Sequence, residues 1–250
     1  MVKKLLILLC LTPALMLVSC SDDDDKPVSP STPTTGSGNL VSETRTLPTF
    51  HSVTLTAVGS IRVSRGTTQS VGIEVDDNIM DYILTSVVNG VLIISSDPSV
   101  SLSDYDLSVT LTMTDLESLT LAGVGSIISE GAPLEADSIY LYLTGVGDIS
   151  IHCEASYISS TFTGVGNLIL MGSVDYQRIV HSAVGTISAY ECSSDTTVAV
   201  LTGIGNVQVF VNDYLNVIIG GRGSLYYMGT PQITSVITGS GQVIDANPSN

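Results

Sequence analysis

Basic side chains are scarce in this chain, which has 8 lysines and arginines against 24 aspartates and glutamates in 250 residues. Nucleic-acid binding depends on lysine and arginine side chains that neutralise phosphates. A surface this acidic repels phosphate, and the same charge opposes adsorption to an anionic lipid surface. The sequence therefore excludes nucleic acid as a partner. It also requires any membrane attachment to come from something other than charge.

Tryptophan is absent, and no stretch of useful length has the periodicity of an amphipathic helix. Valine, isoleucine and threonine are abundant instead. Apolar and polar residues alternate in IYLYL at 139–143 and in NVQVF at 206–210. A period of two residues is typical of half-buried strands, so the sequence predicts an all-β fold.

Only one apolar run is long enough to need a separate explanation. Residues 5–18 are almost wholly apolar and follow Lys3 and Lys4. The run is shorter than the roughly 20 residues of a comfortable membrane span, and it has the layout of a signal peptide. It ends in LVSC at 17–20, which resembles a bacterial lipobox. We therefore expect residues 1–19 to be a lipoprotein signal peptide and Cys20 to carry the acyl chains of a membrane anchor. An ordinary secretory signal with a chance cysteine is the alternative.

The segment after Cys20 predicts a tether and a cellular address. Asp22–Asp25 form an acidic run that resembles the export signal of lipoproteins displayed on the outer face of the outer membrane. Display on the periplasmic face is the alternative. The rest of residues 20–39 is rich in Pro, Ser, Thr and Gly, a composition typical of an extended linker. Without the signal peptide, 6 basic and 24 acidic residues give a formal charge of −18.

A glycine-containing motif recurs through the rest of the chain. LTGVGDISI at 143–151 reappears as FTGVGNLIL at 162–170 and LTGIGNVQV at 201–209. Successive copies of its second glycine are 66, 22, 19, 19, 20, 18 and 18 residues apart, so the last seven recur about every 19 residues. We call these the anchor glycines: Gly59, Gly125, Gly147, Gly166, Gly185, Gly205, Gly223 and Gly241.

Each position of the motif has a physical interpretation. An invariable anchor glycine indicates a positive φ or a contact too close for a Cβ atom. The residue after it always has a polar side chain suited to turns, and Asp148 is its only carboxylate. The next residue is always aliphatic and begins a strand. The motif therefore predicts the corner of a repeating β-structure, with glycine positions that are structural.

A period of about 19 residues predicts a β-solenoid, resembling a parallel β-helix, with coils about 4.8 Å apart. We expect residues 40–115 to form an irregular N-terminal β portion and residues 116–247 to form the repeat solenoid. Cys153 and Cys192 fall two coils apart on this register. That separation exceeds the reach of a disulfide, so the sequence predicts two separate thiols.

The motif does not match known ligand loops. A dinucleotide loop needs a third glycine and a helix, and neither follows GVG here. Calcium-binding β-rolls supply a carboxylate at every copy, whereas seven of the eight polar positions are neutral. His51, His152 and His181 lie at different repeat positions and lack metal-ligand spacing. We therefore expect no metal, no cofactor and no catalytic residue.

Tyrosines are the best candidates for ligand contacts, because their rings can stack on sugars. Tyr140 and Tyr142 share one strand face, and Tyr226 and Tyr227 follow the arginine-bearing corner at Arg222. Core and surface packing of the rings is the alternative interpretation. Acidic residues of the N-terminal portion could line a catalytic groove like that of a β-helix enzyme, although such residues are usually in loops. These acidic candidates are Asp76, Asp77, Asp104 and Asp106.

The repeated corner, preceded by Leu-Thr and following the opening FHSVTL at 50–55, resembles the family called “putative autotransporter adhesin, head GIN domain”. The resemblance covers roughly residues 44–245. It implies a small β-solenoid on a cell-envelope protein, frequently a lipoprotein, and brings no catalytic residue with it. Arg222 and Ser240 depart from the corner pattern, where valine or isoleucine is usual.

Two functions remain open from the sequence. The first is a non-enzymatic, surface-anchored adhesin-like or structural module that binds a glycan or a cell-surface protein with its exposed β-faces. A homo-oligomer is a further candidate assembly. The second is a β-helix enzyme or binding protein acting on polysaccharides. A groove with two acidic residues and an arginine or lysine would favour the enzyme. An unbroken row of the polar residues that follow the anchor glycines, without a deep pocket, would favour the binding module.

Overall fold

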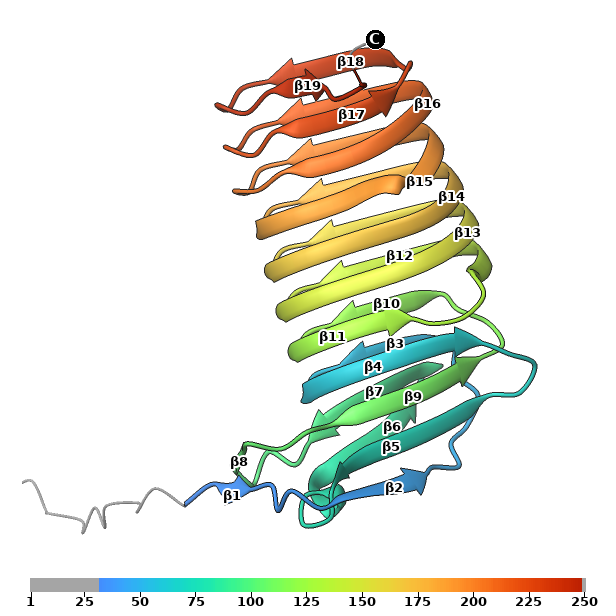
Figure 1. The fold of residues 1–250 in the computed structure, drawn as a ribbon, viewed down its shortest axis with the longest axis vertical. Coiled ribbons are helices and arrows are strands. Elements are labelled where there is room, and N and C mark those ends of the chain that lie inside the picture. The colour runs from blue at the N-terminus through green and yellow to red at the C-terminus, as the bar shows by residue number, and fades with distance from the viewer. Residues whose placement is uncertain (1–31, 249–250) are drawn as a thin grey trace, which may run out of the picture. The chain divides into compact units, whose positions relative to one another are not determined.

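The computed structural model describes residues 32–248, which fold almost wholly into β-strands with one 3-10 turn, η1 (Met80–Tyr82), and no α-helix (Figure 1). The signal peptide, Cys20 and the acidic run of the predicted tether lie outside the described residues. None of the helical structure in the described part is long and apolar enough to cross a membrane.

The strands fall into an N-terminal group and a repeat group. The N-terminal strands are β1 (Thr34–Thr35), β2 (Leu40–Thr44), β3 (Ser52–Leu55), β4 (Val58–Arg65), β5 (Ser70–Asp76), β6 (Ile83–Val88), β7 (Val91–Ser96), β8 (Leu102–Ser103) and β9 (Ser108–Met113). The repeat strands are β10 (Ser118–Leu121), β11 (Val124–Ser129), β12 (Leu134–Leu143), β13 (Val146–Phe162), β14 (Val165–His181), β15 (Val184–Leu201), β16 (Val207–Ile219), β17 (Leu225–Gly229), β18 (Gln232–Ile237) and β19 (Val243–Asp245).

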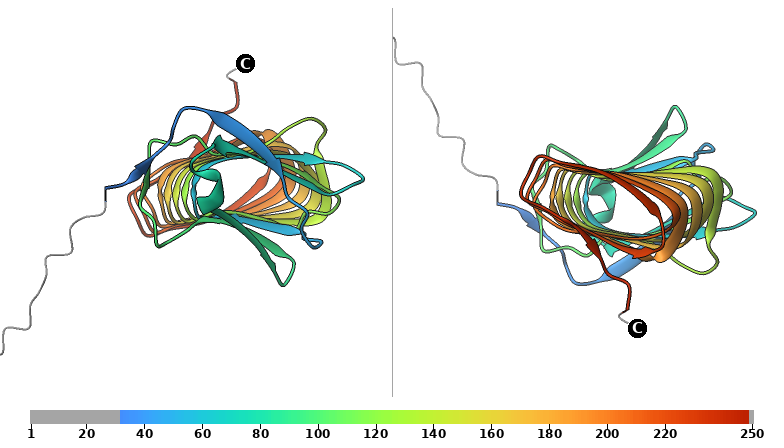
Figure 2. Two further views of the ribbon diagram at one scale, coloured as in Figure 1. Left: turned by 90° about the horizontal axis from the view of Figure 1, so that it is seen from below. Right: turned by 90° about the horizontal axis from the view of Figure 1, so that it is seen from above.

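The predicted β-solenoid is confirmed, with about seven turns of about 19 residues. Each of the long strands β13, β14 and β15 starts at the residue before an anchor glycine and bends around the tube to the next corner. All of the pairings between coils are parallel and place equivalent motif residues side by side, as in Ile127↔Ile149↔Leu168. Seen along the long axis, the coils of residues 33–248 superpose as a flattened tube (Figure 2).

The early copy of the motif at 56–63 belongs to the solenoid. β3 and β4 pair in parallel with β10 and β11, and Gly59 lies beside Gly125. Between these two coils the chain makes the excursion β5–β9, which pairs largely antiparallel. This excursion buries Ile79, Met80 and Ile83, and η1 lies across the N-terminal end of the tube (Figure 2). The N-terminal β portion therefore covers this end of the core.

Ordered structure begins before the expected boundary at Leu40. β1 pairs with β8, and the Gly38 N–H donates to the Asp76 carboxylate over 2.6 Å. Asp76 is 3% exposed and also accepts the Asp106 N–H. A buried carboxylate requires such donors, so residues 34–39 are held against the cover and are not part of a free tether.

The anchor glycines allow the backbones of successive coils to approach closely. A Cβ atom on Gly166 would lie 1.8 Å from the carbonyl oxygen of Gly147, and a Cβ on Gly185 would lie 1.7 Å from that of Gly166. Gly166 also has φ of 141°, a conformation that residues with a side chain rarely adopt. No other residue type fits this contact without moving the coil.

The polar residue after the anchor glycine hydrogen-bonds from coil to coil. Asp148 Oδ1 accepts the backbone N–H and the side-chain amide of Asn167, and Asn167 Oδ1 accepts the Thr186 N–H. Nearer the C-terminus, Asn206 Oδ1 accepts the Ser224 N–H and Ser224 Oγ accepts the Gln242 N–H. These side chains supply acceptors for corner N–H groups, and Asp148 is one member of the ladder.

The interior is aliphatic with a few polar exceptions. Cys153 and Cys192 are buried free thiols, with Gly172 between them in the register. Because Gly172 has no side chain, the two thiols face each other across its coil. The neighbouring Cys192 thiol and burial raise the pKa of the Cys153 thiol. The two thiols are therefore separate, as predicted.

His181 occupies an interior column otherwise held by Leu143, Phe162 and Leu201. Its ring is fully buried and packs edge-on against Phe162, with the centroids 5.1 Å apart. Nε2 donates to the Gly185 carbonyl over 3.0 Å, whereas Nδ1 has no partner among the described residues. Burial lowers the pKa of His181 below its ordinary value of 6.5, so the ring is held neutral.

We expect Gly166→Ala to lower the free energy of unfolding by about 3 kcal/mol or more, because the new Cβ atom overlaps a neighbouring carbonyl at a strained φ. Urea unfolding measures the change. Gly220→Ala is the matched control, since a Cβ there lies 3.7 Å from its nearest neighbour. Similar stabilities of the two variants would contradict the close-approach explanation of the anchor glycines.

We expect His181→Leu to flatten the pH dependence of stability below pH 6.5. The folded state binds a proton at His181 less readily than the unfolded state does. The contribution of the neutral His181 ring to the free energy of unfolding is therefore fully present above the pKa of the unfolded state. It is lost as the pH falls toward the pKa of the folded state, by about 1 kcal/mol for each pH unit. Urea unfolding of wild type, His181→Leu and the partly exposed His152→Leu between pH 7.5 and 5 measures this slope. An unchanged slope in His181→Leu would contradict a neutral buried ring.

Candidate binding surfaces

Three tyrosines form a stacked array on the outer surface of the solenoid, and we call them the tyrosine platform: Tyr140, Tyr157 and Tyr176. The rings of Tyr157 and Tyr176 are stacked with centroids 5.6 Å apart, and Tyr140 is tilted against Tyr157 at 5.9 Å. Tyr140 and Tyr176 are 39% and 37% exposed. The platform therefore offers aromatic faces and edges to solvent across three successive coils.

One cation lies next to this platform. Arg178 is exposed and stands two residues after Tyr176, on the same face of β14. It shares a ladder column with Tyr140, through Ser159. Arg178 takes part in none of the ion pairs found among residues 32–248. Its guanidinium is therefore available to a ligand at the edge of the platform.

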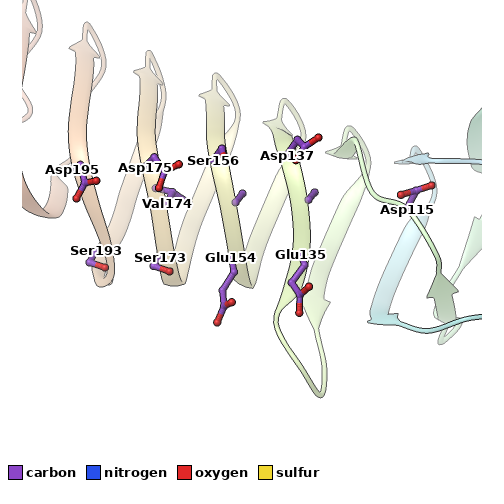
Figure 3. Close-up of a pocket in the computed structure, with 12 residues that line it drawn as sticks. Asp115, Glu135, Asp137, Glu154, Ser156, Ser173, Val174, Asp175, Ser193 and Asp195 are labelled. Carbon is purple, nitrogen blue, oxygen red and sulfur yellow. The ribbon is translucent and has the colours of Figure 1, made fainter.

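An acidic groove of about 640 Å³ runs across the same coils. Its floor contains Ala136, Ala155 and Val174, and its carboxylates and serines form two rows along the solenoid axis (Figure 3). One row holds Asp137, Ser156, Asp175 and Asp195, and the other holds Glu135, Glu154, Ser173 and Ser193, with Asp115 at one end.

The groove and the platform adjoin each other. Ser156 and Asp175 immediately precede Tyr157 and Tyr176, so the two surfaces share an edge over β13 and β14. No lysine or arginine lines the groove, although Arg65 pairs with Glu135 at 2.6 Å from outside. The combined surface has aromatic rings, carboxylates, serines and one arginine, which are groups that can stack on and hydrogen-bond to a polyhydroxylated ligand.

The sequence-based candidates fall on separate surfaces. Tyr140 belongs to the platform, whereas Tyr142 lies in the next outward column, between Thr120 and Thr161. Tyr226 and Tyr227 lie on β17, which pairs with the first half of β16. The ladder column of Tyr140 continues instead to β18, which pairs with the second half of β16. Arg222 stands at a corner, where its N–H donates to the Gly203 carbonyl. The structure therefore does not combine these five residues into one site.

Sequence reasoning missed Tyr157 and Tyr176, although a signal was present. Each lies ten residues after its anchor glycine, Gly147 or Gly166. Aligning the strands between corners, and not only the corners, would have placed the two rings in one column.

The acidic candidates of the N-terminal portion are partly structural. Asp76 is buried and holds backbone N–H groups. Asp77 accepts hydrogen bonds from Ser37 and Asn39, and the Ser37 hydrogen bond is the main cause that lowers its pKa. These two carboxylates fasten residues 37–39 to the cover, which explains them without a catalytic role. Within residues 32–248, no three histidines, cysteines or carboxylates are grouped to hold a metal ion.

A third surface is an apolar stripe along the glycine corners. Its side chains are half exposed and stack in register from coil to coil. Serines and threonines flank a shallow depression of about 510 Å³ beside part of the stripe. Its residues are Val58, Val124, Val146, Val165, Val184 and Ile204.

Comparison with known proteins supports the architecture. A family model described as “Putative auto-transporter adhesin, head GIN domain” matches residues 49–231. Among curated proteins, none matches the chain.

Solved structures of proteins from Bacteroides and Parabacteroides species have similar folds. A structure described as “a putative adhesin” from Bacteroides fragilis has a TM-score of 0.82 and 24% identity, covering 85% of this chain and 99% of its own. A “putative lipid binding protein” from Parabacteroides distasonis has a TM-score of 0.67 and 18% identity, covering 86% and 100%. A “putative adhesin” from Parabacteroides merdae has a TM-score of 0.63 and 18% identity, covering 86% and 99%. At these identities the likeness establishes the fold alone.

Proposed function

This chain belongs to the family described as “Putative auto-transporter adhesin, head GIN domain”, and we propose that it is a non-enzymatic, surface-anchored lipoprotein that binds an extended glycan with one outer face. The adhesin-like character of the family supports a binding role. The lipid on Cys20 and display on the outer surface of the outer membrane complete the proposal.

The tyrosine platform beside the acidic groove is the observation that carries the proposed ligand class. Three rings at intervals of less than 6 Å follow the coil repeat, so the surface is periodic along the solenoid axis. An extended polymer with a repeating unit can contact such a surface at several points, and shallow contacts add through multivalency. The rings stand on the paired strands β12, β13 and β14, which hold them in place before a ligand binds. This order reduces the conformational entropy that is lost on binding.

A polysaccharide-cleaving enzyme is the second candidate, because the groove brings carboxylates into two neighbouring rows. Glycoside hydrolases need a general acid and a second carboxylate on opposite sides of the scissile bond. The groove has carboxylates without a lining arginine or lysine, and it is an open surface depression. That arrangement favours binding over catalysis.

The function is tested with the chain lacking residues 1–32 on arrays of neutral and anionic glycans and of cell-surface proteins. We expect a glycan to bind and to remain intact in prolonged incubation. Release of shortened oligosaccharides would replace the binding module with the enzyme. Binding to proteins alone would replace the glycan as the ligand.

We expect Tyr157→Ala with Tyr176→Ala to weaken glycan binding about tenfold or more, because two stacking rings contribute on the order of 1–3 kcal/mol together. Isothermal titration calorimetry with the best array glycan measures this loss. Tyr226→Ala is the control, since Tyr226 is a partly exposed tyrosine on β17, outside the ladder columns of the platform. Equal losses in both variants would contradict the platform as the binding surface.

A further inference from the structure

The two ends of the described solenoid terminate differently. The N-terminal end is covered by β2, the β5–β9 excursion and η1. At the other end, β18 pairs only with β16 and β19 pairs only with β17 (Figure 1). Within residues 32–248, both final strands therefore keep one edge without a partner.

The aliphatic interior reaches the surface at this end. Leu215 and Ile219 of β16 are buried, and their ladder partners in β18 are Ile233 and Ile237. These two isoleucines are 41% and 45% exposed, and all six residues of β18 are exposed. The columns that form the core in every preceding coil thus end here in contact with water.

The backbone of β18 also has unpaired polar groups. The Thr238 N–H donates to the Ile219 carbonyl, as the equivalent Thr202 N–H donates to His181 in an earlier coil. Alternate residues of a parallel strand direct their N–H and C=O groups to the same neighbour. The groups of Ile233, Ser235 and Ile237 therefore point away from the solenoid, where another strand could bind them.

Charge distinguishes this end from the rest of the surface. Residues 223–244 contain no Asp, Glu, Lys or Arg, whereas residues 32–248 as a whole carry 20 acidic side chains and 5 arginines. Proteins commonly protect exposed sheet edges with charged residues or proline within the strand, and β18 has neither. Asp245, the last residue of β19, is the one carboxylate in β18 and β19, so the two final strands of each copy carry a single negative charge.

We propose that the C-terminal coil is a self-association surface at which two copies meet end to end, with β18 of each copy paired antiparallel about a two-fold axis. A second copy supplies the complementary partner for every exposed feature. Its β18 offers the same three pairs of outward N–H and C=O groups, and its Ile233 and Ile237 cover the open ends of the core columns. Such an interface is isologous and closes after two copies.

The size of the coil sets the strength of the pairing. Strands of six residues at about 3.3 Å each, in sheets about 10 Å apart, give a cross-section of roughly 200 Å². Stable complexes bury about 800 Å² on each partner, so the pairing is weak and concentration-dependent.

The position of the N-terminal strands suits this weak pairing to bridging two surfaces. β1 and β2 lie at the end of the solenoid opposite β18 and β19 (Figure 1), so a two-fold pair has its N-terminal ends pointing in opposite directions. If both copies are anchored through their N-termini, as the proposed function requires, the pair bridges two surfaces. Many such pairs acting together would produce adhesion between like cells.

Sedimentation velocity of the chain lacking residues 1–32 tests the pairing independently of any glycan. This truncation keeps every described strand pairing, because residues 33–250 hold them all. We expect monomer to convert to dimer between about 10 µM and about 1 mM, the range of dissociation constants that suits a small interface. Monomer throughout this range would overturn the proposal.

Ile233→Lys places a charge on the edge and is expected to weaken dimerisation at least tenfold, while the exposed position allows the variant to fold. Val146→Lys, at a corner residue exposed to 49%, is the matched control and is expected to dimerise like wild type. A mixture of Ile233→Lys with Ile237→Glu is expected to form a heterodimer at concentrations where neither variant associates alone, because the two-fold antiparallel pair places residue 233 of one copy opposite residue 237 of the other. Dimerisation that persists in Ile233→Lys, an equal loss in Val146→Lys, or no rescue in the mixture would overturn the end-to-end interface.

Beads carrying the chain through a biotin placed at Pro33 test the bridging geometry. We expect wild-type beads to cluster with one another and Ile233→Lys beads to remain dispersed, in the absence of glycan. Dimers in solution without bead clustering would overturn the bridging arrangement. Failure of glycan binding with intact clustering would instead contradict only the proposed ligand.

Discussion

The contact between anchor glycines of successive coils is the constraint on which the rest of the structure depends. At Gly147, Gly166 and Gly185 the backbones approach so closely that a Cβ atom would lie less than 2 Å from a carbonyl oxygen. This contact keeps the coils in register, because any slip would bring a side chain into the same space. The interior columns, the polar ladder of Asp148 and Asn167, and the outer faces all follow from that register.

A fixed register turns single residues into surfaces. Tyr157 and Tyr176 would be isolated rings on an ordinary sheet, but here they stack because their coils are equivalent. The same repetition places carboxylates in rows and aliphatic side chains in a stripe. The repeat also ends at the last coil, where aliphatic positions that are buried in the preceding coils are exposed to solvent. The proposed binding along the side and the proposed association at the end thus rest on one architecture.

Sequence reasoning succeeded where the relevant contacts repeat along the chain. The spacing of Gly125, Gly147 and Gly166 predicted the coil length, and the spacing of Cys153 and Cys192 predicted separate thiols. It was less successful where contacts join distant segments. The sequence predicts that order starts at Leu40, because nothing local shows that the Asp76 carboxylate is buried against the Gly38 N–H. Tyr140 and Tyr142 were grouped because they alternate on one strand, although Tyr140 actually packs against Tyr157.

The sequence by itself determined the repeat, the corner and the all-β class, because glycine, polar and aliphatic residues report backbone geometry wherever they recur at a constant interval. It also determined the excess of negative charge. The tertiary structure alone decided which residues between the corners share a face, how the N-terminal portion covers one end, and which strand edge stays open. Those features depend on contacts between coils and across the excursion of β5–β9, and such long-range contacts leave no periodic trace in the chain.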